Sequence, residues 1–380
     1  MNARRGPSGV RFAADTLGLV PVLACVGLVS GCGNLDDQIP SQNVAYTPDG
    51  TLAVFTNDAI RLFDSRLQAE THAGIPAAGM TFAPSADGMT FALSADGTTA
   101  AVAYGRTQGL STRNAVRIVR IPTGELVNDI DIAIPPTPPI SPGYFAGLVA
   151  LSPKGDLVYV QNRAQPIDAP SREDSDSSAF RVSDGARLWG GKWLMSPVFS
   201  ADGSSLFATF LPGDGTGEFE LDLVSRDALT GAPRFTVNMG VDGVITLAGG
   251  GLIAGVWWES WDSAGYGIWS SKDGTLIQKF PLIPGHLSGS SNEGQPPLAC
   301  WRDGDLCAVC TSNPDGLKVT IWRTDGTIVR TLAWPSGANI NDIAFSPDGS
   351  LIALAGDKAR VYRISDGELV GERTFRYGVF

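Results

Sequence analysis

Charged side chains are scarce in this chain of 380 residues, and basic ones most of all. Asp, Glu, Lys and Arg make up 18% of the chain, whereas soluble domains average about 25%. There are 28 Lys and Arg against 39 Asp and Glu, which gives a formal net charge of -11. Binding to nucleic acid needs a basic surface that neutralises phosphates. The composition therefore argues against a nucleic-acid partner.

Sequence motifs of the common catalytic, cofactor and metal sites are also missing. The two histidines, His72 and His286, have no Ser, Asp or His at a spacing that suggests a Ser-His-Asp triad. No phosphate-binding loop, dinucleotide-binding glycine motif, His-Glu-x-x-His or haem attachment motif occurs. We therefore expect no cofactor and no metal, and we favour a binding protein over an enzyme.

The start of the chain is basic and then apolar. Arg4, Arg5 and Arg11 precede an apolar run over residues 17–29, which is shorter than the roughly 20 residues of a membrane-spanning helix. A basic start, a short apolar core and small residues before a cleavage point are typical of a secretory signal peptide. We expect residues 1–31 to be such a peptide.

The apolar run ends in Leu28-Val29-Ser30-Gly31-Cys32, which resembles the lipobox of bacterial lipoproteins. The resemblance implies that Cys32 carries acyl chains such as palmitate, which hold the protein on a membrane without a spanning helix. Gly33 follows the cysteine, as in lipoproteins sent to the outer membrane of Gram-negative cells. Residues 32–41 would then be a short tether. Removal of three Arg and one Asp with the signal peptide leaves 25 basic and 38 acidic side chains, a net charge of -13.

A turn pattern recurs seven times along residues 42–380. Each copy has an apolar stretch, a turn that ends in glycine and a second apolar stretch, as in Ile343-Ala344-Phe345-Ser346-Pro347-Asp348-Gly349. Proline sets the first corner of such a turn, Asp caps its amides, and glycine takes the positive φ that closes it. The turn glycines lie 45 to 58 residues apart, at Gly50, Gly97, Gly155, Gly203, Gly250, Gly304 and Gly349. The length alone suggests two or three domains, but the repeats predict one repeat protein.

A second tight turn follows in each unit, as in Val361-Tyr362-Arg363-Ile364-Ser365-Asp366-Gly367. Four strands with two tight turns form the blade of a β-propeller. The repeats resemble divergent WD40-like and Tol-system-like propeller repeats, although the Trp-Asp ending of WD40 strands is missing. The resemblance implies an all-β fold, a single propeller with seven four-stranded blades, with six or eight blades as alternatives. The first and last units are each complete in chain order, which leaves open a ring closed without a strand exchanged between the termini.

The long connections are expected on one face of such a ring. With the strands of a blade named A to D from the axis outward, the B-to-C and D-to-A connections share a face. The expected long connections are residues 105–114, 162–178, 211–217 and 259–265 between strands B and C, and 135–144 and 284–297 between D and A. Long loops on one face of a repeat protein favour binding by that face. Drift in loop length wherever the scaffold permits it is the alternative.

Aromatic, acidic and basic side chains are predicted on this long-loop face. The candidate binding residues are Trp258, Glu259, Trp261, Asp262, Tyr266, Arg163 and Arg172. Trp261 and Tyr266 are expected in a loop, where aromatic rings can stack on sugars or anchor a protein partner. Packing of this loop on its own blade is the alternative. The loops hold more acidic than basic residues, which favours a cationic or neutral partner.

Three cysteines lie close together in the sixth unit. Cys300 and Cys307 flank a predicted A-to-B turn, so they face each other across a hairpin, and Cys310 has no counterpart. Exported compartments are oxidising, so one interpretation is a disulfide between Cys300 and Cys307. The other is that all three are buried small apolar residues.

Together, these patterns predict a lipid-anchored, extracytoplasmic β-propeller of the bacterial cell envelope. We expect a monomeric interaction scaffold whose long-loop face binds an envelope protein or a surface polymer. The alternative function is a propeller hydrolase or lyase that acts on a sugar, lactone or peptide at the central channel.

Overall fold

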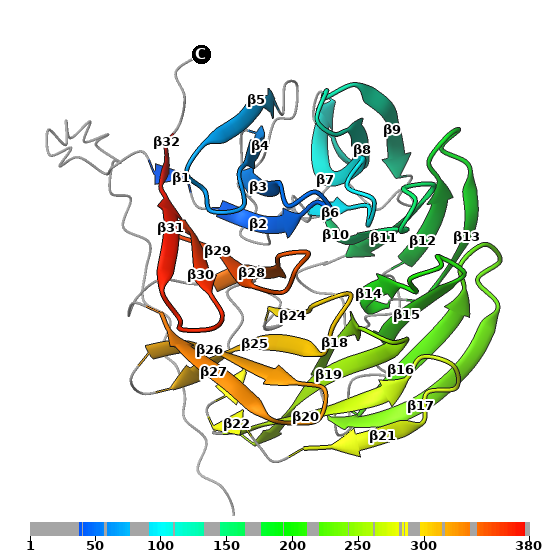
Figure 1. Ribbon diagram of the computed structural model, residues 1–380. Coiled ribbons are helices and arrows are strands. Elements are labelled where there is room, and N and C mark those ends of the chain that lie inside the picture. The colour runs from blue at the N-terminus through cyan, green and yellow to red at the C-terminus, as the bar shows by residue number, and fades with distance from the viewer. Residues whose placement is uncertain are drawn as a thin grey trace, which may run out of the picture. The chain divides into compact units, whose positions relative to one another are not determined.

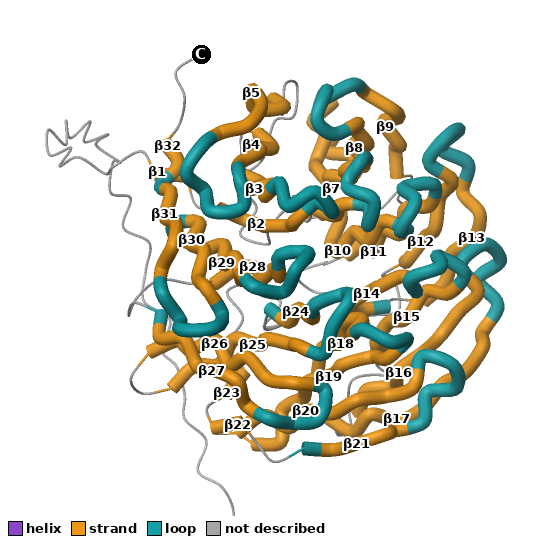
Figure 2. The backbone as a smooth tube through the Cα atoms, in the orientation of Figure 1, coloured by secondary structure: helices purple, strands orange, loops and turns teal. Residues whose placement is uncertain are grey.

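The computed structural model describes strands and turns in most of the chain after residue 37 (Figure 1). The described residues are 38–39, 41–56, 59–76, 91–108, 111–132, 145–163, 176–192, 194–210, 220–241, 243–260, 263–280, 283–284, 286–287, 297–313, 316–334 and 340–376. They contain no helix that is long and apolar enough to cross a membrane. Figure 2 shows strands joined by turns throughout this part of the chain.

Seven four-stranded antiparallel blades form a ring, and their strands pair in chain order (Figure 1). Blades 1 to 3 consist of β2 (Ser41–Tyr46), β3 (Leu52–Thr56), β4 (Ala59–Phe63) and β5 (Glu70–Pro76); β6 (Phe91–Leu93), β7 (Thr99–Gln108), β8 (Ser111–Arg120) and β9 (Leu126–Ile132); and β10 (Phe145–Leu151), β11 (Leu157–Arg163), β12 (Asp176–Arg181) and β13 (Arg187–Lys192). The prediction of one propeller with seven four-stranded blades is confirmed.

The remaining blades follow the same order. Blades 4 to 7 consist of β14 (Met195–Phe199), β15 (Ser205–Phe210), β16 (Glu220–Asp227) and β17 (Pro233–Val241); β18 (Gly243–Ala248), β19 (Leu252–Ser260), β20 (Ser263–Ser270) and β21 (Leu276–Lys279); β24 (Leu298–Cys300), β25 (Leu306–Asn313), β26 (Gly316–Arg323) and β27 (Ile328–Ala333); and β28 (Ile340–Phe345), β29 (Leu351–Gly356), β30 (Ala359–Arg363) and β31 (Leu369–Arg373). Two short strands add to them: β22 (Ile283–Pro284) pairs with β20, and β23 (His286–Leu287) pairs with β25.

A cluster of buried apolar side chains fills each junction between neighbouring blades. Between blades 5 and 6, the rings of Tyr266, Phe280 and Trp322 pack with centroids 4.7 to 5.8 Å apart. The junction between the last and first blades is filled in the same way, by a cluster that includes Leu52 of blade 1 and Val361 of blade 7. Each blade therefore has two apolar faces, and both are covered only when the ring is complete.

The ring closes without an exchanged strand. Blades 1 and 7 are each complete in chain order, and the short strands β1 (Gln38–Ile39) and β32 (Phe375–Arg376) pair with each other. Arg373 of blade 7 donates from Nε to the carbonyl of Leu67 at 2.9 Å and from Nη2 to the carbonyl of Gln68 at 2.7 Å. The closure that the sequence left open is therefore a contact between two complete blades, with a pair of terminal strands beside it.

Leu67 stands in the C-to-D turn of blade 1 where the other blades have a turn glycine. Its φ of +58° lies in the left-handed region, which costs a non-glycine residue roughly 1–2 kcal/mol. Its side chain is 2% exposed and belongs to the cluster between blades 7 and 1, together with Phe375. Burying a leucine contributes about 1.5–3 kcal/mol. The burial therefore offsets the backbone cost at the closing junction.

Two expected B-to-C loops are instead continuations of paired strands. In blade 2, β7 and β8 stay in register from Gly105 opposite Asn114 to Gln108 opposite Ser111. In blade 5, β19 extends to Ser260 and β20 begins at Ser263. The predictions of loops over residues 105–114 and 259–265 are therefore wrong, because the antiparallel ladder extends to Gln108 opposite Ser111 and to Ser260 opposite Ser263.

The other expected long connections lie mainly outside the described residues. This holds for residues 164–175 and 211–219 between strands B and C, and for residues 133–144 between strands D and A. Part of the 284–297 connection is strand, since it contains β23 and the end of β22. The one-sided distribution of long loops stays a prediction.

Leu67→Ala should destabilise the whole propeller, because it opens a cavity at the closing junction. Replacement of a buried leucine by alanine costs about 2–5 kcal/mol, which urea unfolding followed by tryptophan fluorescence would measure. Leu229→Ala is the control: Leu229 lies in the C-to-D turn of blade 4 and is 61% exposed, so its loss should stay within about 0.5 kcal/mol. Equal effects of the two substitutions would contradict this view of the closing junction.

Candidate functional site

The structure describes some of the predicted binding residues, and others lie outside the described part of the chain. Cys32, Arg172, Trp261 and Asp262 lie outside the described residues. Arg163 is the last residue of β11. Trp258 and Glu259 belong to the end of β19, next to the connection that leads to β20. The B-to-C ends of blades 3 and 5 therefore hold three of the candidates in strands.

Tyr266 is not a surface residue, which corrects the sequence prediction. It lies inside β20 and is 1% exposed. Its ring contacts Phe280 and Trp322 at the junction with blade 6, and its hydroxyl donates to the carbonyl of Gly326 at 3.3 Å. Burial raises the pKa of its hydroxyl. The aromatic residue thus stabilises the ring and cannot contact a partner.

Cys300 and Cys307 form a disulfide across the A-to-B hairpin of blade 6. They are paired residues of β24 and β25, so the bond joins neighbouring strands at the inner end of the blade. Cys310 is a free, buried cysteine, and burial raises the pKa of its thiol to about 12. Cys310 therefore stays a neutral, small apolar residue in the junction with blade 7.

The A-to-B turns of blades 1, 2, 4 and 7 share one capping geometry, in which a Ser or Thr hydroxyl donates to the turn aspartate. In blade 7, the Ser346 hydroxyl donates to Asp348 Oδ1 at 2.6 Å, and the Ser350 amide donates to the same oxygen at 3.0 Å. The hydrogen bond from Ser346 is the largest of the effects that lower the pKa of Asp348. In blade 3 a lysine replaces the turn aspartate, and the Ser152 hydroxyl donates to Asp156 Oδ1 instead. These carboxylates hold their own turns and are not arranged around a reaction centre.

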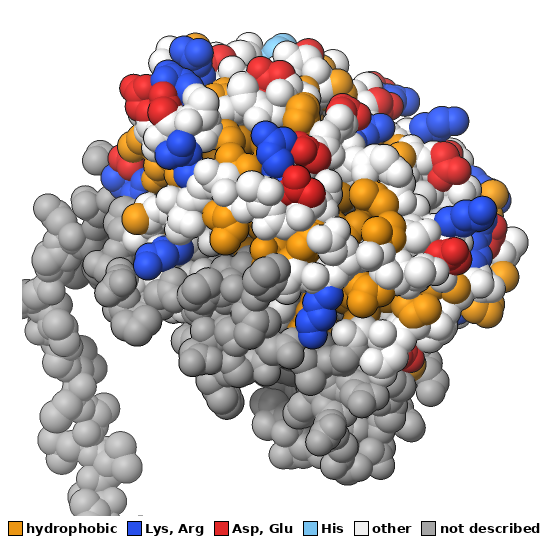
Figure 3. All heavy atoms as spheres, turned by 60° about the horizontal axis from the view of Figure 1, so that its bottom comes forward, with side chains coloured by type: hydrophobic (Ala, Val, Ile, Leu, Met, Phe, Trp, Pro, Cys, Tyr) orange, Lys and Arg blue, Asp and Glu red, His pale blue; other side chains and the backbone are white. Residues whose placement is uncertain are grey.

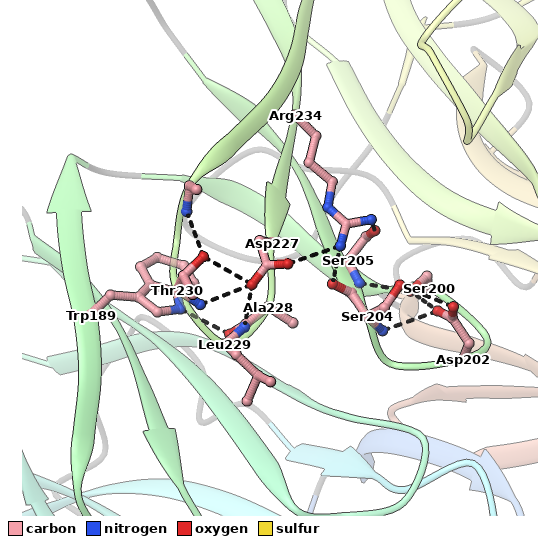
Figure 4. Close-up of polar contacts among 11 residues, drawn as sticks. Trp189, Ser200, Asp202, Ser204, Ser205, Asp227, Ala228, Leu229, Thr230 and Arg234 are labelled. Atoms are coloured by element: carbon pink, nitrogen blue, oxygen red, sulfur yellow. Dashed lines mark hydrogen bonds and ion pairs between the residues drawn. The ribbon is translucent and has the colours of Figure 1, made fainter.

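Arg234 links two turns of blade 4 (Figure 4). It donates from Nη1 to the Ser205 hydroxyl at 2.8 Å, and from Nη2 to the Ser204 carbonyl at 3.1 Å and to Asp227 Oδ2 at 2.9 Å. The hydrogen bond from Arg234 is the first cause that lowers the pKa of Asp227 to about 2. The A-to-B and C-to-D turns of this blade are therefore held together on the same face.

The outer strand of one blade also holds the C-to-D turn of the next. Arg330 in β27 donates to the carbonyls of Ile364, Ser365 and Asp366 of blade 7 at 2.8, 2.6 and 2.9 Å. Trp189 in β13 donates from Nε1 to the carbonyl of Ala228 of blade 4 at 2.9 Å. Sequence reasoning missed these contacts. The only feature of the sequence that could have indicated them is a polar or aromatic residue at the third position of an outer strand.

The inner strands β2, β6, β10, β14, β18, β24 and β28 surround the axis (Figure 1). As the structure describes them, they carry one acidic or basic side chain, that of Asp342 in β28. An enzyme of the predicted alternative kind would need at least two converging carboxylates here, so these strands do not favour it. Nor do the described residues contain a group of three or more His, Cys, Asp or Glu that could hold a metal ion.

Asp342 joins the inner strands of blades 7 and 1. Its Oδ2 accepts hydrogen bonds from the Val44 amide at 3.0 Å and from Asn43 Nδ2 at 3.3 Å, and its Oδ1 accepts from the Ile343 amide at 2.9 Å. Burial raises the pKa of this carboxyl to about 6, against the opposing effect of the three donors. Asp342 is therefore a ring-closing residue whose carboxylate loses water when the fold forms.

Comparison with solved structures identifies the architecture. The fold matches a chain in the crystal structure of the mitotic checkpoint complex with a TM-score of 0.57 and 12% identity, over 97% of this chain and 99% of that one. It matches the structure of U3-55K with a TM-score of 0.55 and 13% identity, over 83% and 88% of the two chains. The protein is a seven-bladed β-propeller.

A third solved structure has the same fold. The propeller also matches hydrazine synthase of Kuenenia stuttgartiensis, with a TM-score of 0.56 and 14% identity, over 93% of this chain and 100% of that one. At such identities the likeness is one of fold alone. No protein-family model matches the sequence, and no curated protein matches it.

Asp342→Asn should change how the stability of the propeller depends on pH. The folded carboxyl has a pKa near 6 instead of 3.8, so the folded state binds the proton more tightly than the unfolded state. The contribution of Asp342 to the free energy of unfolding therefore rises by on the order of 2 kcal/mol as the pH falls from 7 to 4. Relative to Asp342→Asn, the wild-type protein should gain stability over this range in urea unfolding.

Asp348→Asn is the control, because the effect of pH on the contribution of Asp348 to stability has the opposite sign. The pKa of Asp348 is lowered in the fold, so its contribution is present at neutral pH and is lost as pH falls through the folded pKa. Relative to Asp348→Asn, the wild-type protein should lose stability on acidification. The same pH trend for both comparisons would contradict the assignment of Asp342.

Proposed function

We propose that this protein is a lipid-anchored, extracytoplasmic scaffold that binds an envelope protein or a surface polymer. The observation that carries the proposal is the closed seven-bladed ring with a WD40-like fold. A similar chain belongs to the mitotic checkpoint complex, which is an assembly of proteins. A ring of this kind offers a large rigid surface whose connections can vary without a change in its apolar junctions.

The inner strands support binding over catalysis. Asp342 is held by three N–H donors from its own and the neighbouring strand. Its carboxylate thus closes the ring and has no second carboxylate opposite it in the described inner strands. A general acid and a general base need two groups of different pKa that reach the same substrate. We therefore do not favour the hydrolase or lyase alternative.

Two features support an extracytoplasmic location. The lipobox-like Leu28-Val29-Ser30-Gly31-Cys32 follows a basic and apolar start. Cys300 and Cys307 form a disulfide, and disulfides persist mainly in oxidising compartments. We propose the bacterial cell envelope, with the outer membrane favoured in a Gram-negative cell.

The binding surface that we propose is the face of the B-to-C and D-to-A connections. Arg163, Trp258 and Glu259 lie at the ends of strands that lead into it, and Arg172, Trp261 and Asp262 belong to the connections themselves. The acidic excess of these connections suits a cationic or neutral partner. Tyr266 is left out, because it is buried. We propose that the propeller acts as a monomer.

Cys32→Ser should abolish lipidation. Because the thiol accepts the first acyl chain, the variant should accumulate as an unprocessed precursor without incorporated palmitate, while the wild-type chain is labelled and shortened. Metabolic labelling with palmitate followed by immunoprecipitation measures this. Normal labelling of Cys32→Ser would reject lipidation at this cysteine.

Shortening the connections at residues 164–175 and 261–262 should abolish capture of a partner from envelope extracts. The readout is cross-linking followed by mass spectrometry on the full-length protein. Leu229→Ala, on the opposite face, is the control and should leave capture intact. Unchanged capture after both deletions would reject the proposed face.

A further inference from the structure

The A-to-B turn of blade 1 lacks a contact that the turns of several other blades make. In blades 2, 3, 4 and 7 the turn glycine lies against the preceding blade, where an added Cβ would come within 3.4 Å of Thr47, Thr99, Pro153 or Trp301. At Gly50 of blade 1 an added Cβ would meet no atom of the described residues within 4 Å, and the same holds for Gly250 of blade 5. The turn of blade 1 therefore does not pack on blade 7 in this way at the closing junction.

The A-to-B turn of blade 6 differs from the other six turns at two neighbouring positions. Trp301 stands where the other blades have Ser, Thr or Ala, and Arg302 follows where they have Pro, Ala or Gly. The equivalent pairs are Thr47-Pro48, Ser94-Ala95, Ser152-Pro153, Ser200-Ala201, Ala248-Gly249 and Ser346-Pro347. Blade 6 thus carries two long side chains with N–H donors where the other blades have small residues or proline.

Trp301 and Arg302 each contact the turn of another blade. Trp301 donates from Nε1 to the carbonyl of Pro347 in blade 7 at 2.9 Å, and its ring lies against Gly349. Arg302 donates from Nη1 to the carbonyl of Ala95 in blade 2 at 3.0 Å. In the ring, blades 7 and 1 lie between blades 6 and 2. Arg302 therefore links the outer neighbours of the two blades that meet at the closing junction.

A disulfide holds the base of this hairpin. Cys300 and Cys307 are opposite residues of β24 and β25, and inside them the Trp301 amide donates to the Leu306 carbonyl at 2.7 Å. β24 is only three residues long, so the covalent bond reinforces a short ladder. The cross-link restricts how far the two strands can separate. Trp301 and Arg302 therefore extend from a fixed base.

The contact of Arg302 does not depend on the charge of its partner. A guanidinium stays protonated in proteins, and the Ala95 carbonyl does not titrate. Figure 3 shows Lys and Arg side chains scattered among Asp and Glu over the described residues in view, so Arg302 is not explained by a broad basic patch there. Unlike the contacts of Asp342, this contact should be the same at pH 6 and at pH 8.

We propose that the A-to-B hairpin of blade 6, residues 300–307, is a clasp that keeps the propeller closed. Trp301 fixes the clasp on blade 7, and Arg302 reaches past blades 7 and 1 to hold blade 2. The clasp supports the closing junction at the end where the turn of blade 1 lacks its contact with the preceding blade. This role goes beyond the proposed scaffold function and does not depend on it.

The test is hydrogen exchange of full-length Arg302→Ala, followed by mass spectrometry. Ala95 and Ala201 occupy the equivalent position in blades 2 and 4, so an A-to-B turn accommodates alanine there. Because a charge-assisted hydrogen bond is lost, amides of β2 and β28 should exchange at least about threefold faster than in the wild-type protein at the same pH. The factor should be equal at pH 6 and pH 8. Amides of β14 and β15 in blade 4 should change by less than about 1.5-fold.

Trp301→Phe is a second variant, which keeps a ring against Gly349 but removes the donor to Pro347. It should also speed exchange of β2 and β28 and leave β14 and β15 unchanged. Arg363→Ala is the matched control: this partly exposed arginine of blade 7 forms ion pairs with Asp366 and Glu368 around its own turn. Its loss should keep exchange of β2 and β28 within about 1.5-fold of the wild-type rate.

Two results would overturn the clasp. One is unchanged exchange of β2 and β28 in Arg302→Ala and Trp301→Phe, and the other is an equal acceleration in β14 and β15, which would show a general loss of stability. An effect of Arg363→Ala as large as that of Arg302→Ala would also contradict it. Capture of a partner tests the scaffold function separately, so either proposal can fail while the other stands.

Discussion

The apolar junction between neighbouring blades is the interaction on which the rest of this propeller depends. A four-stranded blade of about 50 residues has two apolar faces, and one blade alone leaves both in water. Seven clusters of buried side chains cover them in pairs, and the last cluster joins blade 7 to blade 1. Because no strand is exchanged between the termini, this last junction must close by packing, by Asp342 and by Arg373.

The turns and outer strands follow from this packing. The C-to-D turns of blades 7 and 4 are held by Arg330 and Trp189 in the outer strand of the preceding blade, and that of blade 6 is covered by Phe280, which follows such a strand. The C-to-D turns on that face are therefore bound within the ring, and the aspartates of four A-to-B turns accept hydrogen bonds within their own turns. This leaves the opposite face as the place where the surface can vary, and it is there that we propose binding.

The sequence predicts the blades well because their turns are local. Pro, Asp and Gly act within four or five residues, so Gly349 and its six counterparts mark the units without knowledge of any contact. Tyr266 and residues 105–114 were misjudged because the sequence does not show where a ladder of paired strands ends. Asp342 and Arg373 could not be found, since their partners lie 298 and 306 residues away along the chain. The lipobox-like motif is also a short, local pattern. It lies outside the described residues, so lipidation of Cys32 stays a prediction.

The central claim is that the ring is closed by contact between two complete blades. Hydrogen exchange of the intact protein, followed by mass spectrometry, tests it most directly. Amides of β2 and β28, which flank the closing junction, should exchange as slowly as those of β14 and β18, because all of them open only when the ring opens. Fast exchange of β2 and β28 with slow exchange of β14 and β18 would show an open ring and would contradict the account.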